Sequence, residues 1–435
     1  MAALAEVNLW GIRIGVASLE EGERVAAFQY EPDFVPYGIE VCPLLLPLGN
    51  RVYTFPGLAD KTFRGLPGLL ADSLPDRFGR ALIEAWLATQ GRTWDSFNVI
   101  EQLCYLGTRG MGALEFQPAM RAPGKAEPVD ISRLVELASE VLVARGNLRE
   151  SFASDERKAA LAEILQVGTS AGGARAKAVI AWNPSTNEVR SGQLAAPAGF
   201  EHWLLKFDGV TGNRDKENED PQGYTRIEYA YSLMARAAGV EMSECRLLAD
   251  GLRQHFMTRR FDRPGGAAKL HMLSLGGMAH MDFNEPAANT YEQAFDVLYR
   301  LNLGAGAAEQ LYRRMLLNVI GRNQDDHVKN IAFLMDQSGK WSLSPAFDVT
   351  YSYNPVGAWT GRHQMSLNGK RDAFTRADLY QCARRARISR QSATRAFDEV
   401  LGAVKRWSEW AEAAQVSPEH QKKIQTSLRL EMPAS

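Results

Sequence analysis

The chain has 435 residues, with 50 lysine and arginine residues against 51 aspartate and glutamate residues and a formal net charge of −1. Hydrophobic residues make up 45% of it and charged residues 23%, which is ordinary globular usage and excludes global disorder. The balanced charge excludes a bulk field that would hold the protein on nucleic acid or an anionic membrane, so any such binding must be local.

Two features bear on the cellular compartment. The first residues lack a basic segment followed by an apolar block, and no apolar stretch approaches the ~20 residues that span a bilayer. We therefore expect a cytoplasmic protein with no membrane segment. The four cysteines, Cys42, Cys104, Cys245 and Cys382, are scattered singly, which predicts buried thiols and not a disulfide framework or a zinc site.

The first 130 residues predict a small α/β subdomain. Residues 7–30 alternate apolar and polar side chains around a polar turn, as antiparallel strands with one solvated face do. Residues 76–92 carry a helical apolar stripe. Residues 118–130 are rich in Pro, Ala and charge and lack periodicity, which predicts a linker. We therefore place an N-terminal α/β subdomain at residues 1–120.

The middle of the chain predicts helices followed by a sheet. Residues 131–146 and 155–166 have helical periodicity. A run of small residues at 168–177 then leads into an apolar strand, and a second apolar strand ends at Lys206. A long helix is predicted at 225–239.

The C-terminal half reads as mainly helical, interrupted at 323–353 by a polar segment with a hairpin. Asp325 and Asn330 form D-x-x-x-x-N, the interval of the kinase catalytic loop, in which the Asp accepts the substrate hydroxyl proton and the Asn binds magnesium. A hairpin over 331–343 would bring Asp348 back beside Asn330, so that two oxygen ligands could hold Mg²⁺ together with ATP. The alternative is a solvated acidic loop, because this pattern recurs by chance.

Three other features could serve a nucleotide phosphate. Lys206 ends a buried strand, and its ammonium needs either an ATP phosphate or a route to water. Glu228, early in the next helix, could pair with Lys206, although a glutamate there also complements the helix dipole. The loop Ser170–Gly173 could bring backbone amides to phosphates, but it matches neither a P-loop nor G-x-G-x-x-G, and a plain turn is the alternative. Phosphorylation of Thr169 or Ser170 would add about −2 charge and could block nucleotide entry.

Two further clusters have alternative interpretations. Asp325, Asp326, His327 and Asp348 could form a metal-hydrolase cluster, but such a site would need a second dense His/Asp motif, and the remaining histidines are isolated. His327 is therefore expected to orient its loop by hydrogen bonds. The basic cluster 384–395 is either a solvated helix face or a contact for DNA phosphates or an acidic partner.

Taken in order, these motifs resemble the HipA family of bacterial serine/threonine kinases, the toxin halves of type II toxin–antitoxin pairs. The resemblance covers nearly the whole chain. It is carried by FRGLPGLLADSLPDRFGRALIEAWL, TRIEYAYSLMARAAG, MTRRFDR, NQDDHVKNIAFL and SPAFDVTYSY. It implies an α+β, bilobed protein-kinase-like fold related to the phosphoinositide kinases. Residues 1–120 would be the N-terminal subdomain, 130–265 the kinase N-lobe and 266–435 an all-helical C-terminal lobe.

The resemblance also implies roles for individual residues. Asp325 matches the catalytic aspartate, and Asn330 and Asp348 match the magnesium ligands. Arg260 to Asp262 would lie along the adenosine. The sequence departs from the family next to them, at Arg259, where relatives can carry an acidic residue. The residues that would bind ATP are Ser170, Ala171, Gly172, Gly173, Lys206, Glu228, Arg260, Phe261, Asp262, His327 and Lys329, with Ser170 or Thr169 as the autophosphorylated residue.

The implied function is ATP- and Mg²⁺-dependent phosphorylation of a protein substrate, an aminoacyl-tRNA synthetase in some relatives. The implied partner is a helix-turn-helix antitoxin, with operator DNA bound only through the antitoxin complex. The alternative is a catalytically silent scaffold that assembles with the antitoxin as a co-repressor. Metal-dependent hydrolysis is a third and weaker hypothesis.

Overall fold

The computed structural model of the chain describes residues 2–120, 128–144, 151, 154–168, 175–194, 197–211, 223–265 and 267–434. Two compact units are interleaved along the chain. The first comprises Met1–Gln222, Leu248–Leu273 and Leu334–Lys340, and the second comprises Gly223–Leu247, Ser274–Phe333 and Trp341–Ser435. The predicted boundaries near residues 120–130 and 265–266 stay a prediction.

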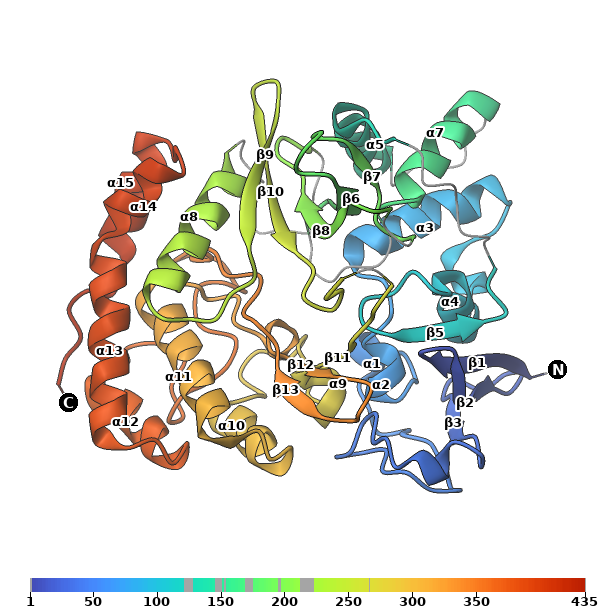
Figure 1. Cartoon of the computed structure of the whole chain (residues 1–435), viewed down its shortest axis with the longest axis horizontal. Coiled ribbons are helices and arrows are strands. Elements are labelled where there is room, and N and C mark those ends of the chain that lie inside the picture. Colours follow the sequence, from blue (N-terminus) through green and yellow to red (C-terminus); the bar gives the residue numbers. More distant parts are fainter. Residues whose placement is uncertain are drawn as a thin grey trace. The chain divides into compact units, whose positions relative to one another are not determined.

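The first unit begins with an antiparallel sheet of order β4-β3-β2-β1-β5, of which Figure 1 labels β1, β2, β3 and β5. In the register, Val7 of β1 pairs with Gly15 of β2 and with Phe116 of β5. The alternation predicted over residues 7–30 is therefore confirmed. The strands are β1 (Ala3–Leu9), β2 (Ile12–Leu19), β3 (Ala27–Tyr30), β4 (Val52–Tyr53) and β5 (Leu114–Gln117).

A second sheet has the order β7-β6-β8-β10-β9. Every residue of β6 is buried, as a continuous apolar strand predicts. Trp203 and Leu205 of β8 share one hydrophobic cluster with residues of α3, α5 and α7. The strands are β6 (Lys177–Trp182), β7 (Val189–Ser191), β8 (Glu201–Lys206), β9 (Cys245–Asp250) and β10 (Arg253–Arg259).

The longer helices of the first unit begin at side-chain caps. Asp76 accepts a hydrogen bond from the Gly79 amide at the start of α3, and Asn98 and Glu101 form a capping box on α4. The predicted helices at 76–92, 131–146 and 155–166 are confirmed as α3, α5 and α7. The helices are α1 (Asp60–Phe63), α2 (Gly68–Ala71), α3 (Arg77–Thr89), α4 (Val99–Leu106), α5 (Ile131–Val143) and α7 (Asp155–Leu165), with 3₁₀ turns at Val35–Tyr37 and Trp94–Ser96.

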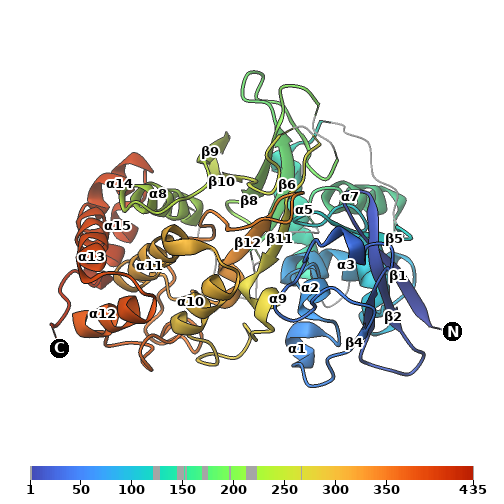
Figure 2. The same cartoon turned by 60° about the horizontal axis from the view of Figure 1, so that its bottom comes forward.

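The second unit is built mainly from helices that pack side by side, as Figure 2 shows for α10, α11, α12 and α13. The central helix α11 buries Leu311, Met315, Leu316 and Ile320 among others. The helices are α8 (Tyr224–Ala237), α9 (Leu275–Ala279), α10 (Tyr291–Arg300), α11 (Gly304–Ile320), α12 (Arg376–Arg385), α13 (Arg390–Lys405), α14 (Trp407–Ala413) and α15 (Pro418–Ser427).

A third sheet corrects one prediction. Its order is β11-β12-β13, and its strands are β11 (His271–Ser274), β12 (Ala332–Met335) and β13 (Trp341–Leu343). An all-helical segment over 266–435 is therefore wrong, because apolar residues on both sides of the turn 336–340 form the hairpin expected there. The division between the two units passes through this sheet and through β9.

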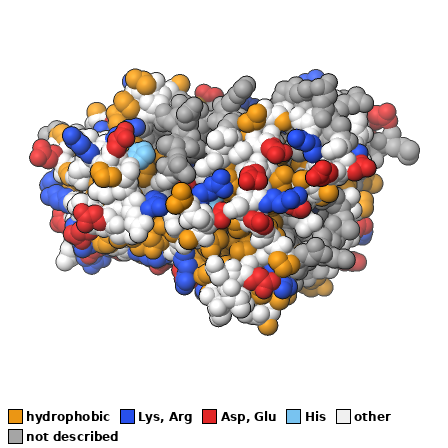
Figure 3. Space-filling model, turned by 90° about the horizontal axis from the view of Figure 1, so that it is seen from above, with side chains coloured by type: hydrophobic (Ala, Val, Ile, Leu, Met, Phe, Trp, Pro, Cys, Tyr) orange, Lys and Arg blue, Asp and Glu red, His pale blue; other side chains and the backbone are white. Residues whose placement is uncertain are grey.

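The surface and the cysteines agree with the composition. On the face seen in Figure 3, basic and acidic side chains are interspersed. Cys42, Cys104, Cys245 and Cys382 are all free and buried, which confirms the prediction of buried thiols. Within the residues that the structure describes, no helix is long and apolar enough to cross a bilayer.

Candidate active site

The segment that carries Asp325 leaves the end of α11 in an extended conformation. Arg322, with a φ of 57°, ends the helical path. Gln324, Asp326 and Val328 are then buried, whereas Asp325 and His327 are partly exposed. This two-residue alternation places Asp325 and His327 on the outer side of the segment, with His327 Nε2 3.8 Å from Asp325 Oδ1.

The D-x-x-x-x-N motif closes on itself. Asn330 Nδ2 donates a hydrogen bond of 2.9 Å to the main-chain oxygen of Asp325. The Asn330 amide N–H also donates to the His327 carbonyl, at 2.9 Å, within a 3₁₀ turn, Val328–Asn330. Trp359 Nε1 donates to Asp325 Oδ1 at 2.7 Å. One oxygen of the Asp325 carboxylate is therefore anchored, while the side chain remains 39% exposed.

Main-chain hydrogen bonds hold the chain on both sides of Asp348. Asp348 has a φ of 55°, in the left-handed region that non-glycine residues rarely adopt. Before it, the Ala346 amide donates to the Glu241 carbonyl at 2.7 Å. After it, Ser352 forms a parallel bridge with Asn323. The chain that follows Asp348 therefore runs beside the segment that leads to Asp325.

Asn330 and Asp348 offer the ligand chemistry that magnesium prefers, one amide and one carboxylate oxygen. Because Asn330 donates through Nδ2, its Oδ1 is the atom left to act as a ligand. In the described part of the chain, no group of three or more His, Cys, Asp or Glu side chains could hold a metal ion. The donor set fits a hard ion that keeps bound phosphate oxygens and waters, and joint binding by these two residues stays a prediction.

The residue after Asp325 was missed as part of the site. Asp326 is 3% exposed and accepts hydrogen bonds from Tyr291 Oη at 2.7 Å and from His363 Nδ1 at 2.8 Å. Burial would raise the pKa of Asp326, but the interactions with His363, Tyr291 and the Gln364 amide outweigh burial and lower it. The sequence carries no signal that places Asp326 on the inner side, because Gln324 and Asp326 are both polar and interrupt any apolar alternation.

Lys206 lies in the first unit, at the end of β8, with 5% of its surface exposed. The register sets it directly opposite Lys177 in β6 and Phe256 in β10, and its Nζ is 5.9 Å from the centre of the Phe256 ring. Lys177 Nζ is 3.1 Å from a carboxylate oxygen of Asp76, and both side chains are buried. Two buried ammonium groups thus share one position along the sheet.

The predicted adenosine-contacting residues are engaged with one another. Arg260 Nη2 donates to Asp262 Oδ2 at 2.6 Å, and Arg263 Nη1 donates to the same oxygen at 2.7 Å. The Gly112 amide also donates to it at 2.7 Å. Arg260 and Asp262 are 4% and 0% exposed, so a role of the Arg260–Asp262 segment in binding adenosine stays a prediction.

The other predicted site residues fall in different places. Thr169 and Ser170–Gly173 lie outside the described residues. Glu228 is buried in α8 of the second unit, so its pairing with Lys206 of the first unit stays a prediction. Lys329 Nζ lies 5.0 Å from the centre of the Phe283 ring, and the same ring lies 5.8 Å from His327.

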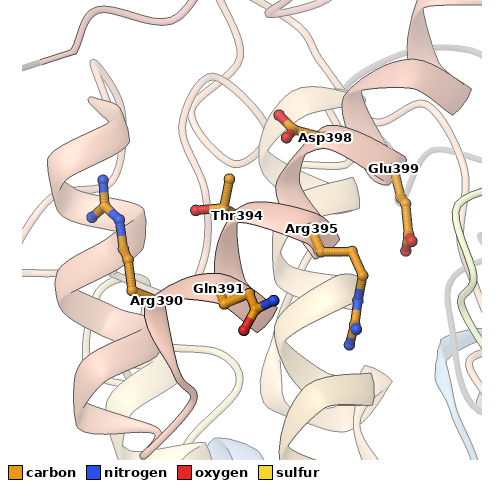
Figure 4. A pocket seen from close by; sticks show the side chains of 6 residues that line it. All are labelled: Arg390, Gln391, Thr394, Arg395, Asp398 and Glu399. Atoms are coloured by element: carbon orange, nitrogen blue, oxygen red, sulfur yellow. The ribbon is translucent and has the colours of Figure 1, made fainter.

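The basic cluster 384–395 largely faces partners of its own. The guanidinium carbon of Arg387 lies 4.4 Å from the centre of the Tyr299 ring, and that of Arg390 lies 3.3 Å from the centre of the Tyr380 ring. Arg395 Nη2 lies 3.3 Å from Glu309 Oε1. Figure 4 shows Arg390 and Arg395 pointing in different directions from α13, along a pocket that also contains acidic residues. This arrangement favours a solvated helix face over a phosphate-binding patch.

Two family models match successive parts of the chain. Residues 5–117 match the model of the HipA N-terminal domain, and residues 169–408 match that of the HipA-like C-terminal domain. No curated protein matches the chain.

Two solved structures are similar to the chain. One is HipA in complex with HipB and operator DNA, from a toxin–antitoxin system of Shewanella oneidensis MR-1, with 16% identity, 97% of this chain and 94% of that chain covered and a TM-score of 0.66. The other is the proinflammatory kinase CtkA of Helicobacter pylori, with 12% identity, 59% of this chain and 87% of that chain covered and a TM-score of 0.36. The first similarity shows a shared fold, and the two domain matches show that this chain belongs to the HipA family.

Proposed function

We propose that this protein is an ATP-dependent serine/threonine protein kinase that acts as the toxin of a type II toxin–antitoxin system. Membership of the HipA family supports the proposal. The observation that carries it is the geometry of Asp325: a partly exposed carboxylate with one oxygen held by Trp359 and its main chain closed onto Asn330. This arrangement supports the roles of Asp325 as a catalytic base and of Asn330 as a neighbouring metal ligand.

Each residue would have one task in phosphoryl transfer. Asp325 would accept the proton of a substrate hydroxyl through Oδ2, because both described contacts of this carboxylate reach Oδ1. Asn330 and Asp348 would hold Mg²⁺, which neutralises charge on the transferring phosphoryl group. Lys206 would bind the ATP phosphates. Little further chemistry is needed, since this reaction depends mainly on positioning and charge stabilisation.

The proposed partners follow from the family and from charge. The similar HipA structure contains HipB and operator DNA, so we propose a helix-turn-helix antitoxin as the partner here. A net charge of −1 favours DNA binding through that antitoxin. The substrate would be a protein hydroxyl, with an aminoacyl-tRNA synthetase as the first candidate, and Ser170 or Thr169 would be the site of self-phosphorylation.

The test uses the full chain incubated with Mg²⁺ and ATP. We expect phosphate on the 169–175 loop by phosphopeptide mass spectrometry, and loss of both the phosphate and growth inhibition in Asp325→Asn and Asp348→Asn. Asp336→Asn is the matched control, because Asp336 accepts hydrogen bonds only within its own hairpin turn in the described structure. Unchanged labelling in both site variants would refute the kinase, and absence of Mg²⁺-dependent ATP binding would favour the co-repressor scaffold.

A further inference from the structure

A buried carboxylate lies directly behind the proposed catalytic base. Asp326 Oδ2 accepts hydrogen bonds from Tyr291 and His363, and its Oδ1 accepts one of 2.8 Å from the main-chain amide of Gln364. The side chains of Asp326 and His363 are 1% and 0% exposed. A buried carboxylate is tolerated only when donors satisfy it, so these three contacts fix its orientation.

One branch of this network reaches the C-terminal end of the chain. His363 donates to the carboxylate through Nδ1, and because a guanidinium can only donate, its Nε2 is the acceptor for Arg429. Arg429 Nη1 lies 2.9 Å from that Nε2 and 2.7 Å from the Val319 carbonyl, to which it donates. Arg429 also donates to Asp372. The residue that follows α15 by two positions is thereby tied to Asp326.

A second branch returns to the catalytic base. The side-chain amide of Gln364 donates to the main-chain carbonyls of Trp359 and Arg362, and the Trp359 indole donates to Asp325 Oδ1 at 2.7 Å. Asp326, Gln364, Trp359 and Asp325 therefore form a closed ring of hydrogen bonds, completed by the peptide bond between the two aspartates. A shift of Asp326 would be passed to the indole that anchors Asp325.

We propose that Asp326, His363 and Arg429 are positioning residues, which hold Trp359 against Asp325 and so present Asp325 Oδ2 to the substrate hydroxyl. The segment after α15, which carries Arg429, would thereby help to position the base for phosphoryl transfer. This inference rests on the proposed kinase function. Its physical basis is that a misplacement of about 1 Å in a catalytic group costs roughly 100-fold in rate.

The test compares Arg429→Met with Arg429→Lys, which keeps one cationic donor, and with Arg406→Met. Arg406 is the matched control, because it is an exposed arginine 3.5 Å from Glu409. Circular dichroism checks that Arg429→Met is folded. If it is not, His363→Asn is used instead, because the Asn amide keeps a donor to Asp326 and removes the imidazole nitrogen that contacts Arg429. Two readouts are needed: kcat with KM for ATP, and the ¹⁵N-indole resonance of Trp359 assigned through Trp359→Phe.

We expect Arg429→Met to lower kcat roughly 100-fold, to leave KM for ATP within about twofold, and to move the Trp359 indole resonance. Arg429→Lys should recover part of both effects, and Arg406→Met should change neither. An unmoved resonance overturns the inference, with or without a fall in kcat. If the wild type binds ATP but transfers no phosphate, the kinase proposal fails, and the resonance still decides whether Arg429 positions Asp325.

Discussion

Asp262 in the first unit, a predicted ATP-binding residue, and Asp326 in the second, next to the predicted catalytic Asp325, are both buried carboxylates. Their hydrogen-bonding partners differ in kind. Asp262 is held by two guanidinium groups, of Arg260 and Arg263, and by the Gly112 amide. Asp326 is held by a phenol, an imidazole and a main-chain amide. One acid is thus paired with permanent cations, and the other is satisfied by groups that need not carry charge.

Burial and neighbouring donors act in opposite directions on the pKa values of Asp262 and Asp326. Burial would raise the pKa of Asp262, but the charges of Arg260 and Arg263 and their hydrogen bonds hold it well below its usual range. Burial also lowers the pKa of Arg263 to about 10, although Asp262 opposes this shift. For Asp326, the electrostatic interaction with His363, together with the hydrogen bonds from His363, Tyr291 and the Gln364 amide, outweighs burial and lowers the pKa.

The difference indicates separate purposes for the two acids. The Asp262 cluster joins the end of β10 to the segment of Gly110 and Gly112, because Arg263 also donates to the carbonyls of both glycines. It is a brace within the first unit. The Asp326 network instead leads to the partly exposed Asp325, so it is suited to fixing the direction of one side chain.

The largest effect is expected for Asp262→Asn. The variant would leave Arg260 and Arg263 buried without a counter-charge, and breaking a buried ion pair costs about 3–5 kcal/mol. Urea denaturation of the full chain measures the loss in free energy of unfolding. Glu201→Gln is the control, because Glu201 pairs with the exposed Arg259 in the same sheet at 3.2 Å and should cost less than about 1 kcal/mol. Equal losses in both variants would contradict the brace.

A smaller loss is expected for Asp326→Asn. The amide keeps the shape, but only its oxygen can accept, so one buried donor loses its partner at a cost of about 1–3 kcal/mol. The same denaturation assay applies, and Tyr291→Phe, which removes one donor instead of the acceptor, gives the matched comparison. If Asp326→Asn were as destabilising as Asp262→Asn, the loss of unfolding free energy would not depend on whether the partners of the carboxylate are cations or neutral donors.

Much of the fold was predictable from local sequence, because the signals are periodic. The alternation at residues 7–30, the stripe at 131–146 and the continuous apolar strand ending at Lys206 each correspond to an observed element. The interleaving of the two units was not predictable, since contacts between segments far apart in sequence leave no local pattern. An all-helical segment over 266–435, which the family resemblance implies, failed because β12 and β13 form the hairpin that the residues at 331–343 themselves predict, and β11 pairs with β12.

The candidate site was predictable only where its residues are close in sequence. The D-x-x-x-x-N spacing placed Asp325 and Asn330 in one closed turn, as the hydrogen bond between them shows. Trp359, His363 and Arg429 were missed, because they reach the segment across 34 or more residues. The burial of Asp326 was not predictable either, because the neighbouring inner residue Gln324 is also polar and no apolar alternation marks the inner side. The chemistry of the site stays a prediction until transfer is measured.

The pH dependence of the unfolding free energy can show whether hydrogen-bond donors or burial control the pKa of a third carboxylate, Asp378. Burial opposes ionisation, yet hydrogen bonds from Lys370, Asn368 and Thr375 lower the pKa of Asp378 to about 2. Since the folded pKa lies below the unfolded value of 3.8, this carboxylate stabilises the fold above pH ~4 and loses that effect as the pH falls towards 2. Asp378→Asn should therefore flatten the decline in unfolding free energy between pH 5 and pH 2.5. An unchanged slope would show that these donors do not favour the ionised form.

The smallest effect is expected where a guanidinium pairs with a carboxylate on the surface. Arg395 lies 3.3 Å from Glu309, and their side chains are 56% and 31% exposed. If the guanidinium charge alone made the Asp262 brace strong, Arg395→Gln would be comparably costly. Because solvent screens this pair, we expect a loss below about 1 kcal/mol, and a smaller one in 1 M salt, where the Debye length is about 3 Å. Urea denaturation at 0.1 M and 1 M NaCl measures both, and a salt-independent loss above about 2 kcal/mol would show that charge and not burial decides the strength of such pairs.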